Sequence, residues 1–309
     1  MSGIVSCSLR YFTATAIRRR SSGLSLQTLF PSGASLTSGL RAPTSSAPPS
    51  HGTPSPSPSL LSVMSTSSRN SSFSADHSDI TYLTQEQATN IDVELFGDYG
   101  FTIDQLMELA GLAVATAIAK AYPPPSKAPP PKVLICSGPG NNGGDGLVAA
   151  RHLKWFGYDP CIFYPKQTAK PIFAALRRQC EEMEISFMSF LPDANLVDNN
   201  FTLAVDALFG FGFKPPVRPE FVEVLQKMCR FKTPIVSVDV PSGWDVETGP
   251  HQDSIKPDMV VSLTAPKKGM QNFHGKHYLG GRYIPDSLAA KFNLKLPRYP
   301  GTELVVQLG

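Results

Sequence analysis

The chain has 309 residues, of which 41% are hydrophobic and 17% are charged, an ordinary globular composition. No acidic residue precedes Asp76, and residues 76–309 carry 25 acidic and 22 basic residues. The folded part is therefore slightly acidic, and we expect no nucleic-acid partner. No stretch approaches the roughly 20 apolar residues of a membrane-spanning helix, and the five scattered cysteines, odd in number, argue against a disulfide framework.

Residues 1–75 form a leader of different composition, in which serine dominates, acids are absent and arginines recur. Its start, "SLRYFTATAIRRR", is typical of a mitochondrial transit peptide. A secretory signal needs an uninterrupted apolar core, which Arg10 and the arginine run break. A disordered tail without an address also fits the serine and proline content. We expect a mitochondrial protein with one domain over residues 76–309; a cytosolic form starting at Met64 and a secreted form are the alternatives.

Two helices are predicted within residues 84–121. In the second, Thr102 is the expected N-cap, and Leu106 and Ala110 belong to an apolar series at helical spacing. These N-terminal helices are a candidate homodimer contact. The following segment, "YPPPSKAPPPK" at 122–132, excludes a helix and predicts an extended connector.

After the connector, short apolar runs alternate with helical patterns. Strands are predicted at 132–138, 161–165, 185–190, 201–210, 234–241 and 258–265. Helices are predicted at 145–157, 170–183 and 218–231. Runs that are apolar on both faces and separated by helices predict a mostly parallel sheet with helices on both faces. Right-handed crossovers then give a doubly wound, Rossmann-like α/β domain, to which the N-terminal helices are added.

The segment "SGPGNNGGDG" at 137–146 has the glycine spacing of a dinucleotide-binding loop between a predicted strand and a predicted helix. Two features differ from that fingerprint. The next strand ends at Pro165, where an NAD site has an acid for the ribose hydroxyls. Asp145 stands at the expected helix start, where it would repel a pyrophosphate. A structural turn with positive-φ glycines is the alternative, but Asn141, Asn142 and Asp145 favour a binding loop.

Two further loops follow strands of the same predicted sheet. The segment "DALFGFGFKPP" places Asp206 at the end of one strand. The segment "SVDVPSGWD" places Asp239 at the end of another, before a turn that contains Ser242. Because ligands of open parallel sheets bind outside the carboxyl ends of the strands, we expect all three loops to line one pocket.

Asn142, Asp206 and Ser242 offer an amide oxygen, one carboxylate and a hydroxyl. Mostly neutral oxygens with a single formal charge suit a large monovalent cation better than magnesium, which prefers compact octahedral sites. Cages rich in carbonyl oxygens are the usual solution for potassium. An Asp206 carboxylate that caps a helix or accepts loop amides is an equally good interpretation.

Asp239 is the candidate acid/base, because a carboxylate at a strand end beside glycine turns can be partly desolvated and exchange protons near neutral pH. The alternative is a carboxylate satisfied by backbone N–H groups. Lys267 and Lys268 are candidates for phosphate contacts, although lone lysines are more often solvated. His274 and His277 lack partners at metal spacing, and we expect no chemical role for them.

The motifs "GPGNNGGDG", "VDALFGFGF" and "VDVPSGWDVETG", in this order, closely resemble the NAD(P)H-hydrate epimerase family, from about Tyr82 to the C-terminus. The resemblance implies interconversion of the R and S forms of NADH and NADPH (NADHX and NADPHX) that are hydrated at C6 of the nicotinamide ring. A separate dehydratase restores only the S form, so that enzyme would be the functional partner. Some relatives are also named for binding an apolipoprotein.

The resemblance also implies roles for individual residues. It assigns substrate binding to Asp239 and to two segments, Asn141, Asn142, Gly143, Gly144 and Asp145, and Gly210, Phe211, Gly212, Phe213, Lys214, Pro215 and Pro216. It assigns one potassium ion (K+) per subunit to Asn142, Asp206 and Ser242.

C6 of the hydrate is a hemiaminal carbon, whose hydroxyl can leave with help from the ring nitrogen lone pair. Water that returns to the opposite face completes the epimerisation, and this exchange needs an acid and a base. We hypothesise that Asp239 transfers the protons, that Asp145 positions water or the ring, and that potassium orders the loops. Competing hypotheses are a nicotinamide-dependent oxidoreductase, against which the missing ribose acid argues, and a non-catalytic nucleotide-binding scaffold that acts through protein partners.

Overall fold

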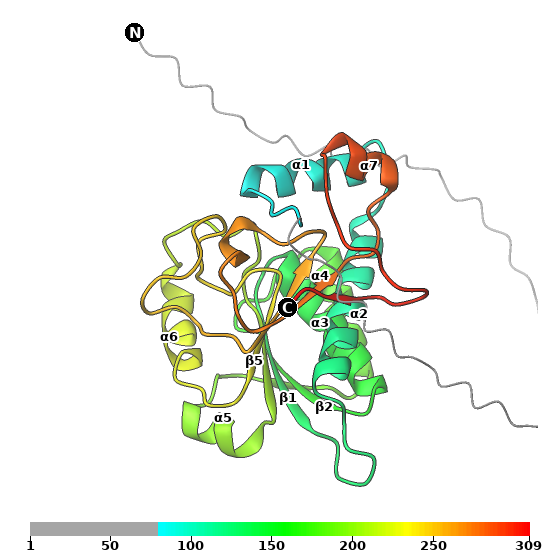
Figure 1. Cartoon of the computed structure of the whole chain (residues 1–309). Helices are drawn as coiled ribbons and strands as arrows, with labels where there is room; N and C mark the ends of the chain where they lie inside the picture. The colour runs from blue at the N-terminus through cyan, green and yellow to red at the C-terminus, as the bar shows by residue number, and fades with distance from the viewer. Residues whose placement is uncertain (1–79) are drawn as a thin grey trace, which may run out of the picture. The chain divides into compact units, whose positions relative to one another are not determined.

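The central feature of the structure, a computed structural model, is an eight-stranded sheet (Figure 1). Its strands are β1 (Lys132–Ser137), β2 (Asp159–Phe163), β3 (Ser186–Met188), β4 (Leu203–Ala207), β5 (Ile235–Val238), β6 (Met259–Leu263), β7 (Lys276–Gly280) and β8 (Val306–Gln307). They lie in the order β3-β2-β1-β4-β5-β6-β7-β8. Strands β1 to β7 pair in parallel, and β8 is antiparallel to β7.

The structure describes residues 80–309. The predictions made for residues 1–75, a leader with a mitochondrial address and a shorter form starting at Met64, lie outside the described residues.

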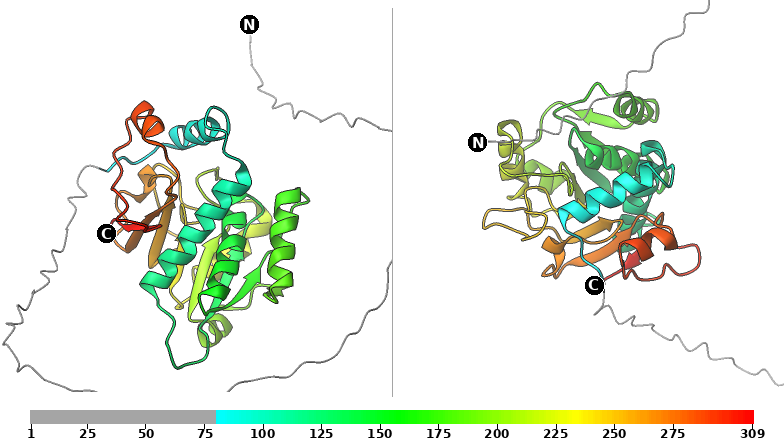
Figure 2. Two further views of the ribbon diagram at one scale, coloured as in Figure 1. Left: turned by 90° about the vertical axis from the view of Figure 1, so that its right-hand side faces the viewer. Right: turned by 90° about the horizontal axis from the view of Figure 1, so that it is seen from above.

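Helices cover both faces of the sheet (Figures 1 and 2). They are α1 (Gln85–Phe96), α2 (Ile103–Ala121), α3 (Asn141–Trp155), α4 (Pro171–Glu182), α5 (Ala194–Asn200), α6 (Pro219–Met228) and α7 (Asp286–Lys291). Helices α2, α3 and α4 bury one apolar face of the sheet, and α5 and α6 bury the other. Helices α1 and α7 share a smaller apolar cluster, and both figures show them beyond the carboxyl ends of the strands.

Strand β1 illustrates why the sequence forms this sheet. Val133 and Ile135 pack in the cluster that includes α2 and α3, whereas Leu134 and Cys136 pack in the cluster that includes α6. Both faces of the strand are therefore apolar, as expected for a parallel strand between two helical layers. The predicted doubly wound α/β fold is confirmed.

The predicted helices and strands are all present, with ends that differ by a few residues. Thr102 is the N-cap of α2, as predicted, and its hydroxyl accepts a hydrogen bond from the Gln105 N–H. The prediction did not include α5, β7, α7 and β8. Helix α5 is short and mostly polar, with Val197 as its buried residue, and β7 begins with Lys276 and His277, so neither carries a strong periodic signal. Within residues 80–309, no helix is long and apolar enough to cross a membrane.

The strand order reverses between β1 and β4. Crossovers on the two sides of this switch point leave toward opposite faces of the sheet, which opens a crevice at the carboxyl ends of the strands.

Candidate active site

A cavity of about 790 Å³ lies at this crevice. Its walls include residues 139–142 after β1, residues 208–214 after β4, Asp239 after β5, and Thr264 and Lys267 after β6. Helices α1 and α2 contribute further side chains. The three loops that the sequence analysis expected to share a pocket therefore do so.

Most of the predicted site residues line this cavity directly. They are Asn141, Asn142, Asp145, Gly210, Phe211, Gly212, Phe213, Lys214, Pro216 and Asp239. Gly143, Gly144 and Pro215 are in the same segments but do not form part of its wall. Asp206 and Ser242 are also absent from the wall and are fully buried.

The helix after the glycine loop begins earlier than predicted. Helix α3 starts at Asn141 with Gly140 as its N-cap, so Asp145 is inside the helix and does not occupy the positive end of its dipole. The sequence-based argument against a pyrophosphate at this helix start was therefore wrong. A Cβ on Gly143 would lie 1.8 Å from the Gly138 carbonyl oxygen, and Gly143 does not have a positive φ. This glycine permits the close approach of α3 to the loop after β1, and it is not needed for a left-handed turn.

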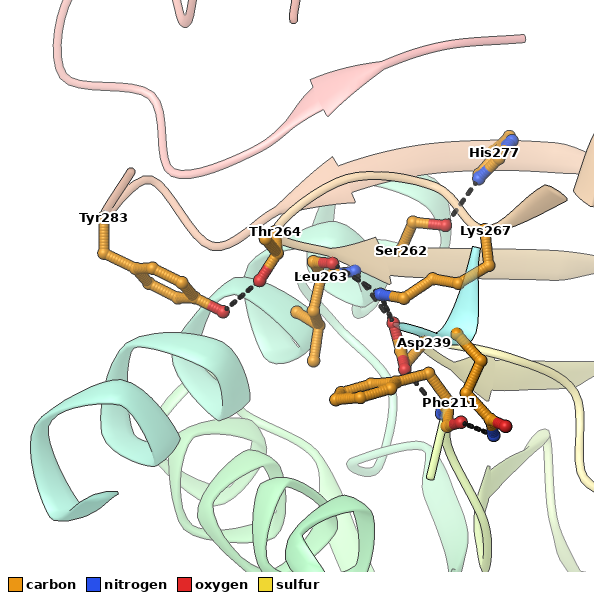
Figure 3. Close-up of polar contacts among 9 residues, drawn as sticks. Phe211, Asp239, Ser262, Leu263, Thr264, Lys267, His277 and Tyr283 are labelled. Carbon is orange, nitrogen blue, oxygen red and sulfur yellow. Dashed lines mark hydrogen bonds and ion pairs between the residues drawn. The ribbon is translucent and has the colours of Figure 1, made fainter. Parts of the chain in front are cut away.

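Asp239 is held on both sides by neighbouring loops (Figure 3). Its Oδ2 accepts a hydrogen bond from the Phe211 N–H at 2.9 Å. Its Oδ1 accepts hydrogen bonds from the Lys267 Nζ and from the Leu263 N–H, the latter at 3.4 Å. The residue is 3% exposed and has a φ of 66°, a left-handed conformation that is uncommon for residues other than glycine and clusters at functional sites. The alternative interpretation, a carboxylate that accepts hydrogen bonds from backbone N–H groups, is therefore correct in part. The carboxylate also pairs with a buried cation.

Lys267 is that cation, and its burial excludes the alternative of a solvated lysine. The side chain is 1% exposed, and its Nζ donates to Asp239 and, at 2.8 Å, to the Leu263 carbonyl oxygen. The Nζ also lies 5.1 Å from the centre of the Phe211 ring, a cation–π contact. Lys268, its neighbour, is exposed. Paired lysines in a sequence give no signal that one of them is buried against a carboxylate.

Two more carboxyl groups share the cavity with Asp239. Burial, together with the nearby carboxylates of Asp239 and Asp92, raises the pKa of Asp145 well above its usual range, against the opposing effect of Lys267. Burial raises the pKa of Asp92 to about 6, Lys267 opposes this shift, and Asp239 adds to it. The sequence analysis missed Asp92. Its signal was an acid on the apolar face of a helix, beside Ile91.

Asp206 and Ser242 form a hydrogen-bonded cluster beneath the loops. The Ser242 hydroxyl and N–H donate to the two carboxylate oxygens of Asp206, at 2.5 Å and 2.8 Å, and the Ser237 hydroxyl donates at 2.8 Å. The Ser242 hydroxyl in turn accepts from the Phe209 N–H at 2.9 Å. Burial raises the pKa of Asp206, although these hydrogen bonds oppose the shift. Asp206 thus accepts hydrogen bonds from the loops, as predicted by the alternative interpretation in which it is not a cation ligand.

Asn142 lies next to the same loop. A Cβ on Gly210 would be 2.9 Å from the Asn142 Oδ1 and 3.1 Å from the Asp239 Oδ2, so both side chains border Gly210. The Asn142 Nδ2 is buried and, among the described residues, has no hydrogen-bond partner. Within residues 80–309 there is no group of three or more His, Cys, Asp and Glu side chains arranged to hold a metal ion.

The two histidines are outside the cavity wall. His274 is exposed, whereas His277 is buried in β7, with Nε2 2.9 Å from the Ser262 hydroxyl. Burial lowers the pKa of His277 to about 4, so this ring is neutral at physiological pH.

These features define a class of protein: a doubly wound α/β protein whose ligand cavity lies at the carboxyl ends of the strands and contains buried carboxyl groups. The model of the family described as YjeF-related protein N-terminus matches residues 103–269. A crystal structure of the yeast protein YNL200c (ynu0) is 40% identical, with a TM-score of 0.70, and the match covers 74% of this chain and 100% of that chain. The chain therefore belongs to this family, the NAD(P)H-hydrate epimerase family, and is an isomerase. The family resemblance seen in the sequence is confirmed.

Other solved structures are more distant. A transhydrogenase from Sinorhizobium meliloti is 18% identical with a TM-score of 0.28, and the match covers 52% of this chain and 44% of that chain. A putative alcohol dehydrogenase from Thermotoga maritima is 16% identical with a TM-score of 0.26, over 47% of this chain and 36% of that chain. At these TM-scores the similarity carries no argument about function.

Proposed function

We propose that this protein interconverts the R and S forms of NADH and NADPH that carry a hydroxyl at C6 of the nicotinamide ring. The observation that carries the proposal is the position of Asp239. This carboxylate is buried at the wall of the 790 Å³ cavity, between the Phe211 N–H and the Lys267 ammonium group. Two other motifs of the epimerase family, at residues 139–142 and 208–214, line the same cavity. Buried carboxyl groups in a pocket are typical of acid–base catalysis.

The reaction needs proton transfer and no electron transfer. The C6–O bond breaks as the ring nitrogen lone pair forms the N1=C6 bond, and the hydroxyl takes up a proton and leaves as water. Water then adds to the opposite face of C6 and gives up a proton. We assign a proton-transferring role in this exchange to Asp239, which contacts the substrate in this proposal.

Asp145 has a different role in the proposed mechanism. Burial raises the pKa of Asp145 well above its usual range, which favours the protonated carboxyl group, the form that can donate a hydrogen bond to the ring carboxamide or to water. The segments 141–145 and 210–216 form the proposed contacts with the remainder of the hydrate. The N-terminal end of α3 and the side chains of Lys166, Lys214 and Arg218, all at the cavity wall, are suited to its phosphates.

We also propose that Asn142, Asp206 and Ser242 hold one potassium ion per subunit. Their chemistry fits such an ion: one buried carboxylate with mostly neutral oxygens around it, and a buried amide on Asn142 whose Nδ2 lacks a partner among the described residues. Turning that amide would present its oxygen to a cation. The ion would hold together the loops after β1, β4 and β5 and add positive potential beside the cavity.

The remaining proposals concern the cellular context. We propose that the protein acts in mitochondria and supplies the S form to a separate dehydratase, and that the N-terminal helices form a homodimer contact. A scaffold that acts through a partner such as an apolipoprotein is the less favoured alternative, because a scaffold needs neither a buried Asp239–Lys267 pair nor protonatable carboxyl groups in its pocket.

Chiral chromatography tests the central proposal directly. Purified full-length protein is incubated with the R hydrate of NADH, and the appearance of the S form is followed above the spontaneous rate. We expect rapid conversion by the wild type, and a loss of about 10²–10⁴-fold in Asp239→Asn. A wild-type rate equal to that of buffer alone would exclude the proposed function, and an active Asp239→Asn variant would remove the role assigned to this residue.

A further inference from the structure

Helix α1 is attached to the loops of the cavity at its N-terminal end. Gln85, its first residue, donates from Nε2 to the carbonyl oxygens of Phe211, at 2.6 Å, and Phe213, at 2.8 Å. Leu83, just before the helix, forms a parallel β-bridge with Lys267. These contacts fix α1 to the loops that follow β4 and β6, beyond the carboxyl ends of the sheet (Figure 1).

Asp92 lies on the face of α1 that these contacts turn toward the cavity. Residues seven positions apart on an α-helix are separated by nearly two full turns, so Asp92 is on the same face as Gln85. Ala88 and Leu95 are buried on the adjoining face, and Asp92 and Phe96 form part of the cavity wall. Asp92 is thus a cavity residue although it lies outside residues 103–269, which the family model matches.

The Asp92 carboxyl group is free to bind a ligand. Among residues 80–309, no hydrogen-bond donor reaches it, whereas both oxygens of Asp239 accept hydrogen bonds from the protein. Asp92 is half-buried at the cavity wall, so its carboxyl group can meet a ligand there.

Asp92, Asp145 and Asp239 have different charged neighbours, and this affects how readily each of them transfers a proton. It faces Asp145 of α3, Asp239 after β5, Lys267 after β6, and Tyr283, whose own pKa burial raises. Asp239 is paired with the Lys267 ammonium group, and burial raises the pKa of Asp145 well above its usual range. With a pKa of about 6, Asp92 can give or take a proton near neutral pH.

We propose that Asp92 is the second proton-transferring carboxyl group of this site, an inference that rests on the proposed epimerisation. In one direction, Asp92 gives its proton to the departing hydroxyl, the C6–O bond breaks to release water, and the nitrogen lone pair forms the N1=C6 bond. Water then adds to the opposite face of C6, the electron pair of the double bond returns to nitrogen, and the Asp239 carboxylate takes the proton of that water. In the reverse direction the two carboxyl groups exchange roles. No atom is oxidised or reduced.

The test compares three variants of the full chain in the conversion of the R hydrate of NADH. Asp92→Asn removes the proton-transferring group and keeps the shape of the side chain. We expect it to lower kcat by about 10²–10⁴-fold with little change in KM. Asp92→Glu keeps a carboxyl group and should recover part of this loss. Asp98→Asn, an exposed acid just beyond α1, makes the same change of charge and should retain the wild-type rate.

Each other outcome overturns the proposal. A kcat of Asp92→Asn within about threefold of the wild type excludes proton transfer by Asp92. If KM rises while kcat stays constant, Asp92 binds the hydrate and does not act in the reaction. An Asp92→Asn chain that does not fold, as judged by thermal unfolding, contradicts the unpartnered state of the carboxyl group. A wild type that does not convert the R hydrate removes the proposed function, and this inference with it, whereas an active wild type beside an active Asp92→Asn removes this inference alone.

Discussion

Replacing Lys267 with methionine removes the buried cation that pairs with Asp239. Methionine is similar in length and fills much of the space, so the Asp239 carboxylate stays buried, 3% exposed, without its charge partner. Removing one partner of a buried ion pair costs about 3–5 kcal/mol, because the remaining charge is left uncompensated. A domain of this kind is stable by about 5–15 kcal/mol in total. We therefore expect urea unfolding at pH 8 to show a fall in the free energy of unfolding of about 3–5 kcal/mol.

Two further variants make this measurement specific. Lys268→Met changes an exposed neighbour and should alter stability by less than about 0.5 kcal/mol. Combining Lys267→Met with Asp239→Asn removes both charges and should recover most of the lost stability, since no lone charge remains. The reasoning is refuted if Lys267→Met unfolds at the same urea concentration as the wild type, or if the double variant is no more stable than Lys267→Met.

Three other predictions follow from the site. Replacing potassium with sodium or choline should lower both the thermal unfolding midpoint and the turnover, because the cluster around Asp206 would lose its cation; equal midpoints in the three salts contradict the proposed ion. Gly143→Ala places a Cβ 1.8 Å from the Gly138 carbonyl oxygen and should cost about 1–3 kcal/mol or more, whereas Gly140→Ala, with no atom within 4 Å, should change stability by less than about 1 kcal/mol in the same denaturant titration. Burial raises the pKa of Asp92 to about 6, so the folded chain binds that proton more tightly than the unfolded chain, and the Asp92 carboxyl group lowers stability as the pH rises from about 4 to above 6. Asp92→Asn should therefore be more stable than the wild type by about 1–3 kcal/mol at pH 8, and a difference that does not shrink toward pH 4 contradicts this explanation.

The sheet could be predicted because its strands carry a strong local signal. In β1, residues on both faces are apolar, and Thr102 marks the start of α2 with a capping side chain. These features depend on residues that are close together in the chain. A local stretch of sequence is therefore enough to predict them.

A strand that the prediction missed, β7, and the start of α3, which it placed too late, have contacts with distant residues. His277 is tolerated inside β7 because the Ser262 hydroxyl lies beside its ring. Helix α3 begins at Asn141, although the asparagines and glycines there have low helix propensity, and its Gly143 packs closely against the backbone of Gly138. Neither contact can be read from the local segment.

The amino-acid sequence by itself determined the doubly wound fold, the epimerase family, and the loops that border the cavity. It could not determine which charged groups meet inside that cavity. The sequence marked Lys267 only as a candidate phosphate contact and did not mark Asp92 at all. The bridge between Leu83 and Lys267 and the hydrogen bond from Gln85 to the loop after β4 attach α1 to the loops of the cavity. Hydrophobic periodicity is a local property of the chain, whereas the protonation of a carboxyl group depends on its burial and on charges from distant segments, which the tertiary structure alone brings together.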